Sequence, residues 1–159
     1  MDVGCYAVMI ARWLFAAEPI DVLATIERDP DFRVDRLVSA VMRFPMGQAT
    51  FVCGGQLVRH QRVHLFGTTG RIEVEIPLNA PPDRGCRIFL GDGRDLHASG
   101  DETITMPVVD QYAEQGGYFS RAVRGLGAYP ITLEDSVANM AAIDALFRSA
   151  ESGRWETCV

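Results

Sequence analysis

Residues 71–76, Arg-Ile-Glu-Val-Glu-Ile, alternate charged and apolar side chains at every position. A period of two places successive side chains on opposite faces of a β-strand, so this stretch predicts a strand with one apolar and one solvated face. The residues just before it, Gly67-Thr-Thr-Gly70, are typical of a hairpin turn rather than a helical crossover. Together they indicate an antiparallel sheet that is covered on one side.

The same alternation recurs on both sides of this stretch. Each recurrence predicts a further strand of the same sheet, because apolar residues again take every second position. These segments cover residues 22–26, 38–44 and 49–53, with shorter candidates at 86–90 and 102–106.

Helical patterns replace the alternation at both ends of the chain. Residues 3–15 are apolar on nearly every side, which is typical of a buried helix. Asp110 can cap a second helix, and Thr132 with Asp135 resembles the capping box of a third. The apolar stripe expected to bury this third helix consists of Leu133, Val137, Met140, Ile143, Phe147 and Ala150.

We therefore expect a single α+β domain over residues 1–159. Its open, mostly antiparallel sheet would have about six strands, with helices packed on one face. The other face would still need a cover or a partner.

Charge and cysteine usage narrow the classes of function. A net charge of −6 argues against nucleic acid or an anionic membrane as the main partner. The four cysteines are widely spaced without a C-x-x-C pair, which argues against a zinc or redox motif. The start of the chain has no basic leader region and no membrane-spanning run, so we expect a cytoplasmic protein.

Common motifs for cofactors, metals and nucleophiles are missing from the sequence. No G-x-G-x-x-G follows a predicted strand, no Walker sequence occurs, and all fifteen basic residues are Arg. His60 and His64 lie in a β-patterned stretch, where four residues span about 13 Å, too far for one zinc ion. No nucleophile elbow surrounds a serine. We expect neither a metal nor a cofactor on this chain alone.

Asp2 and Tyr6 are four residues apart at the start of the first predicted helix. On a helix they would share one face. A tyrosine hydroxyl can donate a proton or a hydrogen bond to a carbonyl oxygen, provided that a nearby cation assists it. An aspartate one turn away could bind a sugar hydroxyl. The structural alternative, favoured by spacing alone, is that Asp2 caps the helix and Tyr6 fills the core.

The opening Met1-Asp-Val-Gly-Cys-Tyr6, followed by Arg12 and Glu18-Pro19, resembles the start of the C-terminal domain of the Gfo/Idh/MocA oxidoreductases. This family includes glucose–fructose oxidoreductase, inositol dehydrogenases, and xylose or dihydrodiol dehydrogenases. Later stretches resemble the family in the same order: Gly67-Thr-Thr-Gly-Arg-Ile-Glu73 leading to Pro77-Leu-Asn79, then Asp110-Gln-Tyr112, then the segment from Asn139 to Trp155.

The resemblance implies a two-domain enzyme whose first half is a Rossmann domain that binds NAD or NADP and usually supplies a Lys. The open sheet of the second half would form the subunit interface of a homodimer or higher oligomer. Tyr6 would match the family's acid, and Asp2 the aspartate that helps to bind substrate hydroxyls. Asp110, Gln111 and Tyr112 would lie on the substrate side of the cleft.

This chain departs from the family pattern because it carries neither the glycine loop nor any Lys. One hypothesis is the substrate-binding and oligomerisation domain of an NAD(P)-dependent oxidoreductase for a sugar, polyol or related compound, inactive alone. It would be an excised fragment, or one half of a split enzyme with a Rossmann-domain partner. The alternative is a non-catalytic dimerisation or interaction module. Arg12 could contact a ligand, but a helix-end Arg that binds carbonyls or a carboxylate is the favoured interpretation.

Overall fold

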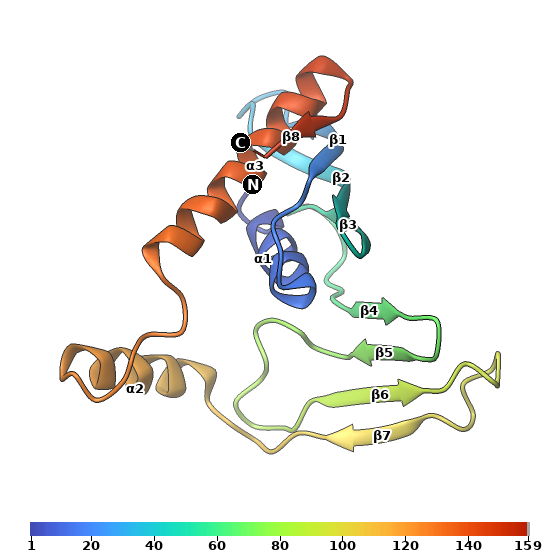
Figure 1. Ribbon diagram of the computed structural model, residues 1–159, viewed down its shortest axis with the longest axis vertical. Coiled ribbons are helices and arrows are strands. Elements are labelled where there is room, and N and C mark those ends of the chain that lie inside the picture. Colours follow the sequence, from blue (N-terminus) through green and yellow to red (C-terminus); the bar gives the residue numbers. More distant parts are fainter. Residues whose placement is uncertain (159) are drawn as a thin grey trace. The chain divides into compact units, whose positions relative to one another are not determined.

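The computed structural model describes residues 1–158. Internal contacts divide the chain into two compact units (Figure 1). The first unit contains residues 1–58 and those from 130 onward, and the second contains residues 59–129. Each unit is built around its own antiparallel sheet.

The first unit places two helices on a four-stranded sheet. The sheet has the order β3-β2-β1-β8, and all of its pairings are antiparallel. The helices α1 and α3 contact each other, and both contact the sheet. The bounds are α1 Gly4–Phe15, β1 Asp21–Arg28, β2 Asp35–Phe44, β3 Gly47–Cys53, α3 Leu133–Ser152 and β8 Glu156–Thr157.

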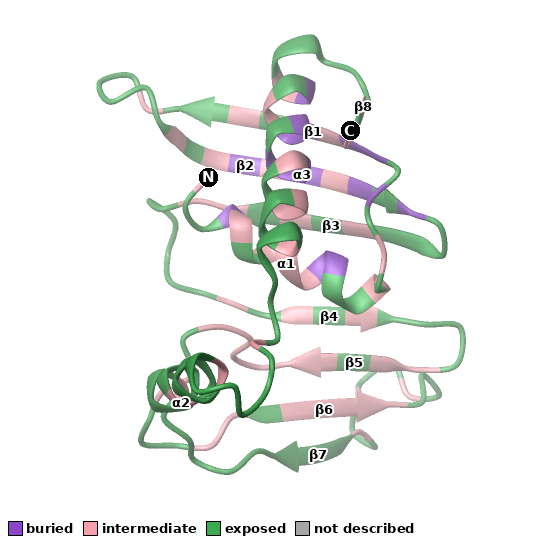
Figure 2. Cartoon of the chain, turned by 60° about the vertical axis from the view of Figure 1, so that its left-hand side comes forward, coloured by how far each residue is buried: buried purple, intermediate pink, exposed green. Residues whose placement is uncertain are grey.

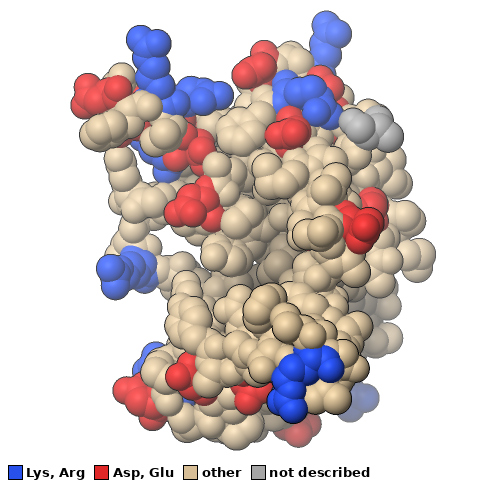
Figure 3. Space-filling view, turned by 90° about the vertical axis from the view of Figure 1, so that its left-hand side faces the viewer, with Lys and Arg blue, Asp and Glu red and all other residues tan. Residues whose placement is uncertain are grey.

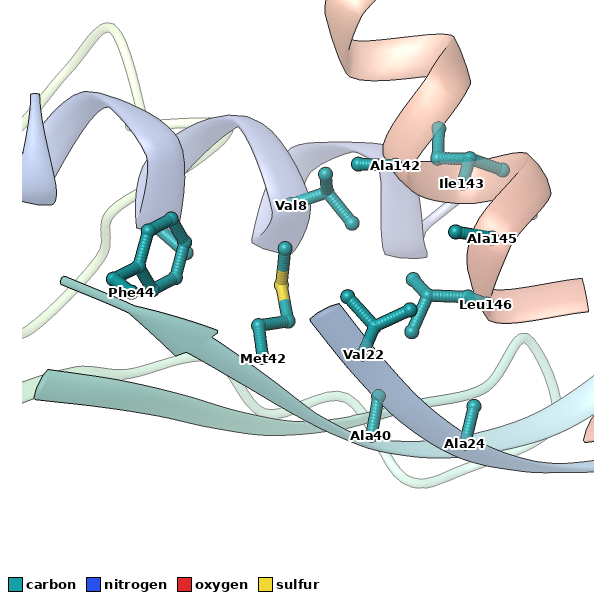
Figure 4. Close-up of a cluster of buried hydrophobic side chains, with 11 residues drawn as sticks. Val8, Val22, Ala24, Ala40, Met42, Phe44, Ala142, Ile143, Ala145 and Leu146 are labelled. Atoms are coloured by element: carbon teal, nitrogen blue, oxygen red, sulfur yellow. The ribbon is translucent and has the colours of Figure 1, made fainter. Parts of the chain in front are cut away.

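The hydrophobic core of the first unit lies between the two helices and the inner face of this sheet (Figure 4). The register pairs Val22 with Met42 and Ala24 with Ala40, so that these four side chains line one face of β1 and β2. Burying such side chains is the main favourable term in folding. The fully buried residues with the largest side chains are Val8, Val22, Val38, Met42, Leu146 and Ser149.

The second unit carries the other sheet, of order β4-β5-β6-β7, and one helix, α2 (Gln111–Val123). Its strands are β4 Val63–Phe66, β5 Arg71–Val74, β6 Arg87–Gly91 and β7 Glu102–Thr105. The amide of Gly67 donates to the carbonyl of Gly70 at 2.8 Å and closes the predicted hairpin between β4 and β5. None of residues 59–129 is fully buried, and the purple of buried residues in Figure 2 is confined to elements of the first unit.

The predicted α+β class is confirmed, with antiparallel strands and helices on one face of the first sheet. The described residues form eight strands in two sheets, whereas we predicted about six in one. The additional strands β4 and β8 have only four and two residues, which is too short for a clear period of two. The predicted strand at 71–76 ends at Val74.

Two predictions about helix burial are wrong. The first helix was expected to be buried on nearly every side, yet Trp13 is 76% exposed because the sheet and α3 contact only the side that carries Val8 and Arg12. In α3 the predicted stripe is exposed at Leu133, Val137 and Met140. The buried residues of α3 begin only at Ala142, in the part of the helix that packs on β1: Ala142, Ile143, Ala145, Leu146 and Ser149.

Candidate substrate-binding and proton-transfer site

The predicted site residues fall into two groups, one in each unit of the chain. Asp2 and Tyr6 belong to the first unit, and Asp110, Gln111 and Tyr112 belong to the second.

Tyr6 lies in the first turn of α1, with its side chain 46% exposed. The alternative in which Tyr6 fills the core is therefore wrong. The backbone of this turn is held by two local hydrogen bonds, from the Cys5 amide to the Met1 carbonyl and from the Tyr6 amide to the Val3 carbonyl. A phenol at this position is accessible to a small molecule, and its backbone is hydrogen-bonded within the turn.

Asp2 does not cap α1, contrary to the structural alternative considered above. The helix begins at Gly4, its N-cap is Val3, and no side chain caps it. Asp2 therefore lies just before the helix rather than one turn from Tyr6 within it. Its side chain is exposed, and its backbone carbonyl accepts a hydrogen bond from Cys5 Sγ at 3.0 Å. The carboxylate has no hydrogen-bond partner among residues 1–158.

The buried side chain of Arg12 links α1 to α3 by hydrogen bonds. Arg12 is 5% exposed and donates from Nε and Nη2 to the two carboxylate oxygens of Glu18, both at 2.7 Å. Its Nη2 also reaches Asp135 at 2.9 Å, and its Nη1 reaches Asn139 at 3.3 Å. The hydrogen bonds to Glu18, and to a smaller extent that to Asp135, raise the pKa of Arg12 above its ordinary value. The interpretation of Arg12 as a helix-end residue bound to carboxylates is confirmed.

The second group lies at the N-terminus of α2. Asp110 caps this helix, because its Oδ1 accepts hydrogen bonds from the amides of Tyr112 and Ala113 at 2.9 and 3.2 Å. Gln111 Nε2 donates to the carbonyl of Ala80 at 3.1 Å and so links α2 to the loop between β5 and β6. The Tyr112 side chain is 67% exposed. One carboxylate oxygen of Asp110, the amide oxygen of Gln111 and the Tyr112 hydroxyl can therefore still contact a ligand.

Several exposed charges form ion pairs, and Figure 3 shows basic and acidic side chains mixed on one face of the molecule. In the second unit Arg87 donates to both carboxylate oxygens of Glu75, at 3.2 and 2.6 Å. This hydrogen bonding lowers the pKa of Glu75 from 4.5 to about 2. Arg87 also stacks on Phe89, with its guanidinium carbon 5.2 Å from the ring centroid.

Residues 1–158 contain no group of three or more His, Cys, Asp or Glu that could hold a metal ion. His64 lies in β4, with its Nδ1 3.8 Å from a carboxylate oxygen of Glu73. His60 lies outside the strands, so the predicted β-placement holds for only one of the two histidines.

The described residues also do not form the usual cradle for a dinucleotide. Such cofactors bind at the carboxyl ends of parallel strands, next to a glycine-rich turn into a helix. Here every pairing in both sheets is antiparallel.

Sequence reasoning missed two polar residues of α3 that organise the first unit. Ser149 is fully buried and bonds to β1 and to the chain after α3. Asn139 lies one helical turn after Asp135, and both reach Arg12. A signal was present, since an arginine in an apolar helix requires polar partners, and two polar residues at i and i+4 offer them on one helix face.

The fold is thus that of a helix-on-sheet α+β protein with an exposed tyrosine at the start of its first helix. Residues 1–73 match the family model described as the GFO/IDH/MocA C-terminal domain. The chain is 45% identical over 157 residues to the oxidoreductase ORF334 of Rhizobium meliloti, covering 98% of this chain and 47% of that protein. It is 34% identical to D-xylose 1-dehydrogenase (NADP(+)) 2 of Haloferax volcanii, over 96% of this chain and 46% of that one.

Solved structures agree on the fold. KijD10, a 3-ketoreductase from Actinomadura kijaniata solved with TDP-benzene and NADP, matches with a TM-score of 0.83 and 21% identity, over 94% of this chain and 46% of its own. Aldose-aldose oxidoreductase from Caulobacter crescentus, complexed with glycerol, matches with a TM-score of 0.75 and 21% identity, over 97% and 45%. At this identity the two matches establish the fold alone.

Residues 1–73 thus match the C-terminal domain of the Gfo/Idh/MocA oxidoreductases, and curated oxidoreductases match nearly the whole chain. It spans about half the length of the curated relatives it matches. No helix within residues 1–158 is long and apolar enough to cross a membrane.

Proposed function

We propose that residues 1–159 act as one substrate-binding and oligomerisation domain of an NAD(P)-dependent oxidoreductase. Its substrate would be a sugar, a polyol or a related hydroxy or carbonyl compound. The observation that carries this proposal is the exposed phenol of Tyr6 at the first turn of a helix that is fastened to its neighbours. The NADP-dependent xylose dehydrogenase among the relatives supports the substrate class.

Tyr6 is proposed to hold and move a proton at the reacting oxygen of the substrate. When a carbonyl becomes a hydroxyl, its oxygen gains a proton, and a positioned phenol can supply it. In the opposite direction the same oxygen loses a proton to the phenolate. Tyr6 Oη is thus the atom of this chain that would touch the reacting centre.

The remaining predicted residues are proposed to bind substrate hydroxyls. The Asp2 carboxylate accepts hydrogen bonds, as do the second carboxylate oxygen of Asp110 and the amide oxygen of Gln111. Tyr112 offers both a hydroxyl and an exposed ring. Sugars and polyols present many hydroxyl donors, which suits the acceptor atoms in each of the two groups.

The nucleotide is proposed to bind to protein outside these residues, because the antiparallel sheets form no cradle for it. When bound, NAD or NADP would supply the hydride chemistry. The contribution of this chain is then to bind and orient the substrate and to handle the proton.

Self-association is proposed to use the outer face of the first sheet. Thr25, Ser39 and Val52 form a row across β1, β2 and β3 on the side opposite the core. These side chains are small or β-branched, and Val52 is 64% exposed. A two-fold axis through such a face would bury it against itself.

The alternative is a non-catalytic dimerisation or interaction module. It is favoured by the same antiparallel architecture, which supplies an intact core without a cradle for a nucleotide. The two functions differ in whether the chain can complete an enzyme.

The test is a reconstitution. The chain is mixed with the half of the Rhizobium meliloti relative that lies outside the matched region, and sugar-dependent reduction of NADP is followed with D-xylose and related aldoses. The proposal expects reduction that requires both halves, and we refer to this mixture as the assembled enzyme. If the two halves form a stable complex that binds NADP but reduces none with any of the sugars, the non-catalytic module is supported instead.

A further inference from the structure

The side chain of Asn139 on α3 bridges two different groups of α1. Its Nδ2 donates to the backbone carbonyl of Cys5 at 3.3 Å. Its Oδ1 accepts from Arg12 Nη1, also at 3.3 Å. Asn139 is therefore engaged at both ends of its amide.

The Cys5 carbonyl belongs to the peptide unit that joins Cys5 to Tyr6. A hydrogen bond to this carbonyl fixes the backbone from which the Tyr6 side chain projects. Because the Tyr6 side chain is 46% exposed, packing around its ring restrains it only in part. The position of the phenol depends correspondingly more on the position of this peptide unit.

Arg12 determines which way the Asn139 amide points. A guanidinium only donates hydrogen bonds, so the amide must turn its oxygen toward Arg12 and its nitrogen toward Cys5. Arg12 itself is held by both carboxylate oxygens of Glu18, at 2.7 Å each, and by Asp135 at 2.9 Å. The two carboxylates thus hold Arg12, Arg12 orients the Asn139 amide, and this amide holds the Cys5–Tyr6 peptide.

We propose that Asn139 is a positioning residue for Tyr6, with Arg12 orienting its amide. This role rests on the proposed function, in which Tyr6 Oη handles the proton. Displacing a catalytic group by about 1 Å can cost about 100-fold in rate, even when the change lies away from the chemistry. A hydrogen bond that holds the backbone of Tyr6 can therefore affect the rate without touching the substrate.

The test uses Asn139→Asp in the assembled enzyme. The aspartate keeps an acceptor for Arg12 but loses the donor for the Cys5 carbonyl. We expect kcat to fall about 10- to 100-fold while KM changes less than about twofold.

Ser136→Ala is the matched control, because it removes a side-chain hydrogen bond of α3 that does not reach α1. This bond runs to the carbonyl of the N-cap residue Thr132, at 3.1 Å. The kcat of this variant should be unchanged. Asn139→Ala removes the same donor without adding a charge, so it separates the lost hydrogen bond from an effect of the charge. Its melting temperature is measured together with its kcat.

A double-mutant cycle separates positioning from general damage to the fold. If Asn139 acts through Tyr6, the double variant Tyr6→Phe/Asn139→Asp loses no more kcat than Tyr6→Phe alone. A further loss equal to that of Asn139→Asp alone would overturn the positioning role, as would a normal kcat for Asn139→Asp beside a lowered kcat for Tyr6→Phe. An unchanged kcat for Tyr6→Phe would overturn the acid role of Tyr6 itself, and the positioning role with it.

Discussion

The Ser149 hydroxyl on α3 accepts a hydrogen bond from the backbone amide of Ala24 on β1, at 3.1 Å. The pairing of β1 with β8 covers only Asp21 and Val22, so Ser149 provides an acceptor for the Ala24 amide, which lies beyond that pairing. Ser149 Oγ also donates to the carbonyl of Arg154 at 2.6 Å and holds the turn that leads into β8. One fully buried side chain thus joins helix, strand and turn.

Ser149→Ala should lower the free energy of unfolding by about 1–3 kcal/mol, because it leaves the buried Ala24 amide and Arg154 carbonyl without this partner. Urea unfolding followed by circular dichroism measures the change. Ser152→Ala is the control, because Ser152 is exposed at the end of the same helix. Equal stability of the two variants would contradict the role assigned to Ser149.

Leu146→Ala should cost about 2–5 kcal/mol of stability, because Leu146 is fully buried between α3 and β1 and its truncation leaves a cavity. Leu133→Ala removes the same atoms from the same helix at a position that is 82% exposed, and should change stability by less than about 0.5 kcal/mol. A large effect at Leu133 would show that the first turn of α3 is buried in solution, for example against another protein surface.

Acid should weaken the second unit through Glu75. Its pKa is about 2 in the folded chain against an ordinary 4.5, because Arg87 favours the charged carboxylate. The stabilisation is therefore complete above about pH 4.5 and is lost as the pH falls toward about 2. Glu75→Gln should flatten the dependence of stability on pH in this window, as measured by chemical unfolding at several pH values. Glu114→Gln, at an exposed position of α2, should leave the wild-type dependence intact.

Self-association through the first sheet should be broken by a charge on its outer face. Val52→Arg places a cation in the proposed interface, where two copies would bring like charges together. We expect the wild type to sediment as a dimer at micromolar concentration and Val52→Arg as a monomer. Val58→Arg, at an 89% exposed position outside the strands, is the control and should remain dimeric. A monomeric wild type, or a dimeric Val52→Arg, would contradict the proposed interface.

Local patterns predicted the elements of this fold well. The period of two located β1, β2 and β3, and Asp110 and Thr132 cap helices as expected. Patterns failed where burial depends on partners distant in sequence. An apolar stripe cannot reveal that Leu133 extends beyond the part of α3 that packs on β1.

The same limit applies to the candidate site, whose residues remain predictions. Tyr6 and Asp2 could be named from spacing and from the family resemblance, because both lie in one short segment. Asn139 could not be linked to Tyr6, since 134 residues separate it from the Cys5 carbonyl that it contacts. Only folding brings the two helices together.

Tyr6 is proposed to handle the proton of the reaction. This role is tested by kcat of Tyr6→Phe in the assembled enzyme, beside Tyr118→Phe, which removes the same hydroxyl from another side chain that is 46% exposed. We predict that kcat falls about 100- to 10,000-fold for Tyr6→Phe, the range typical of a lost general acid or base, and stays unchanged for Tyr118→Phe. Equal kcat values for Tyr6→Phe and the wild type would contradict the claim.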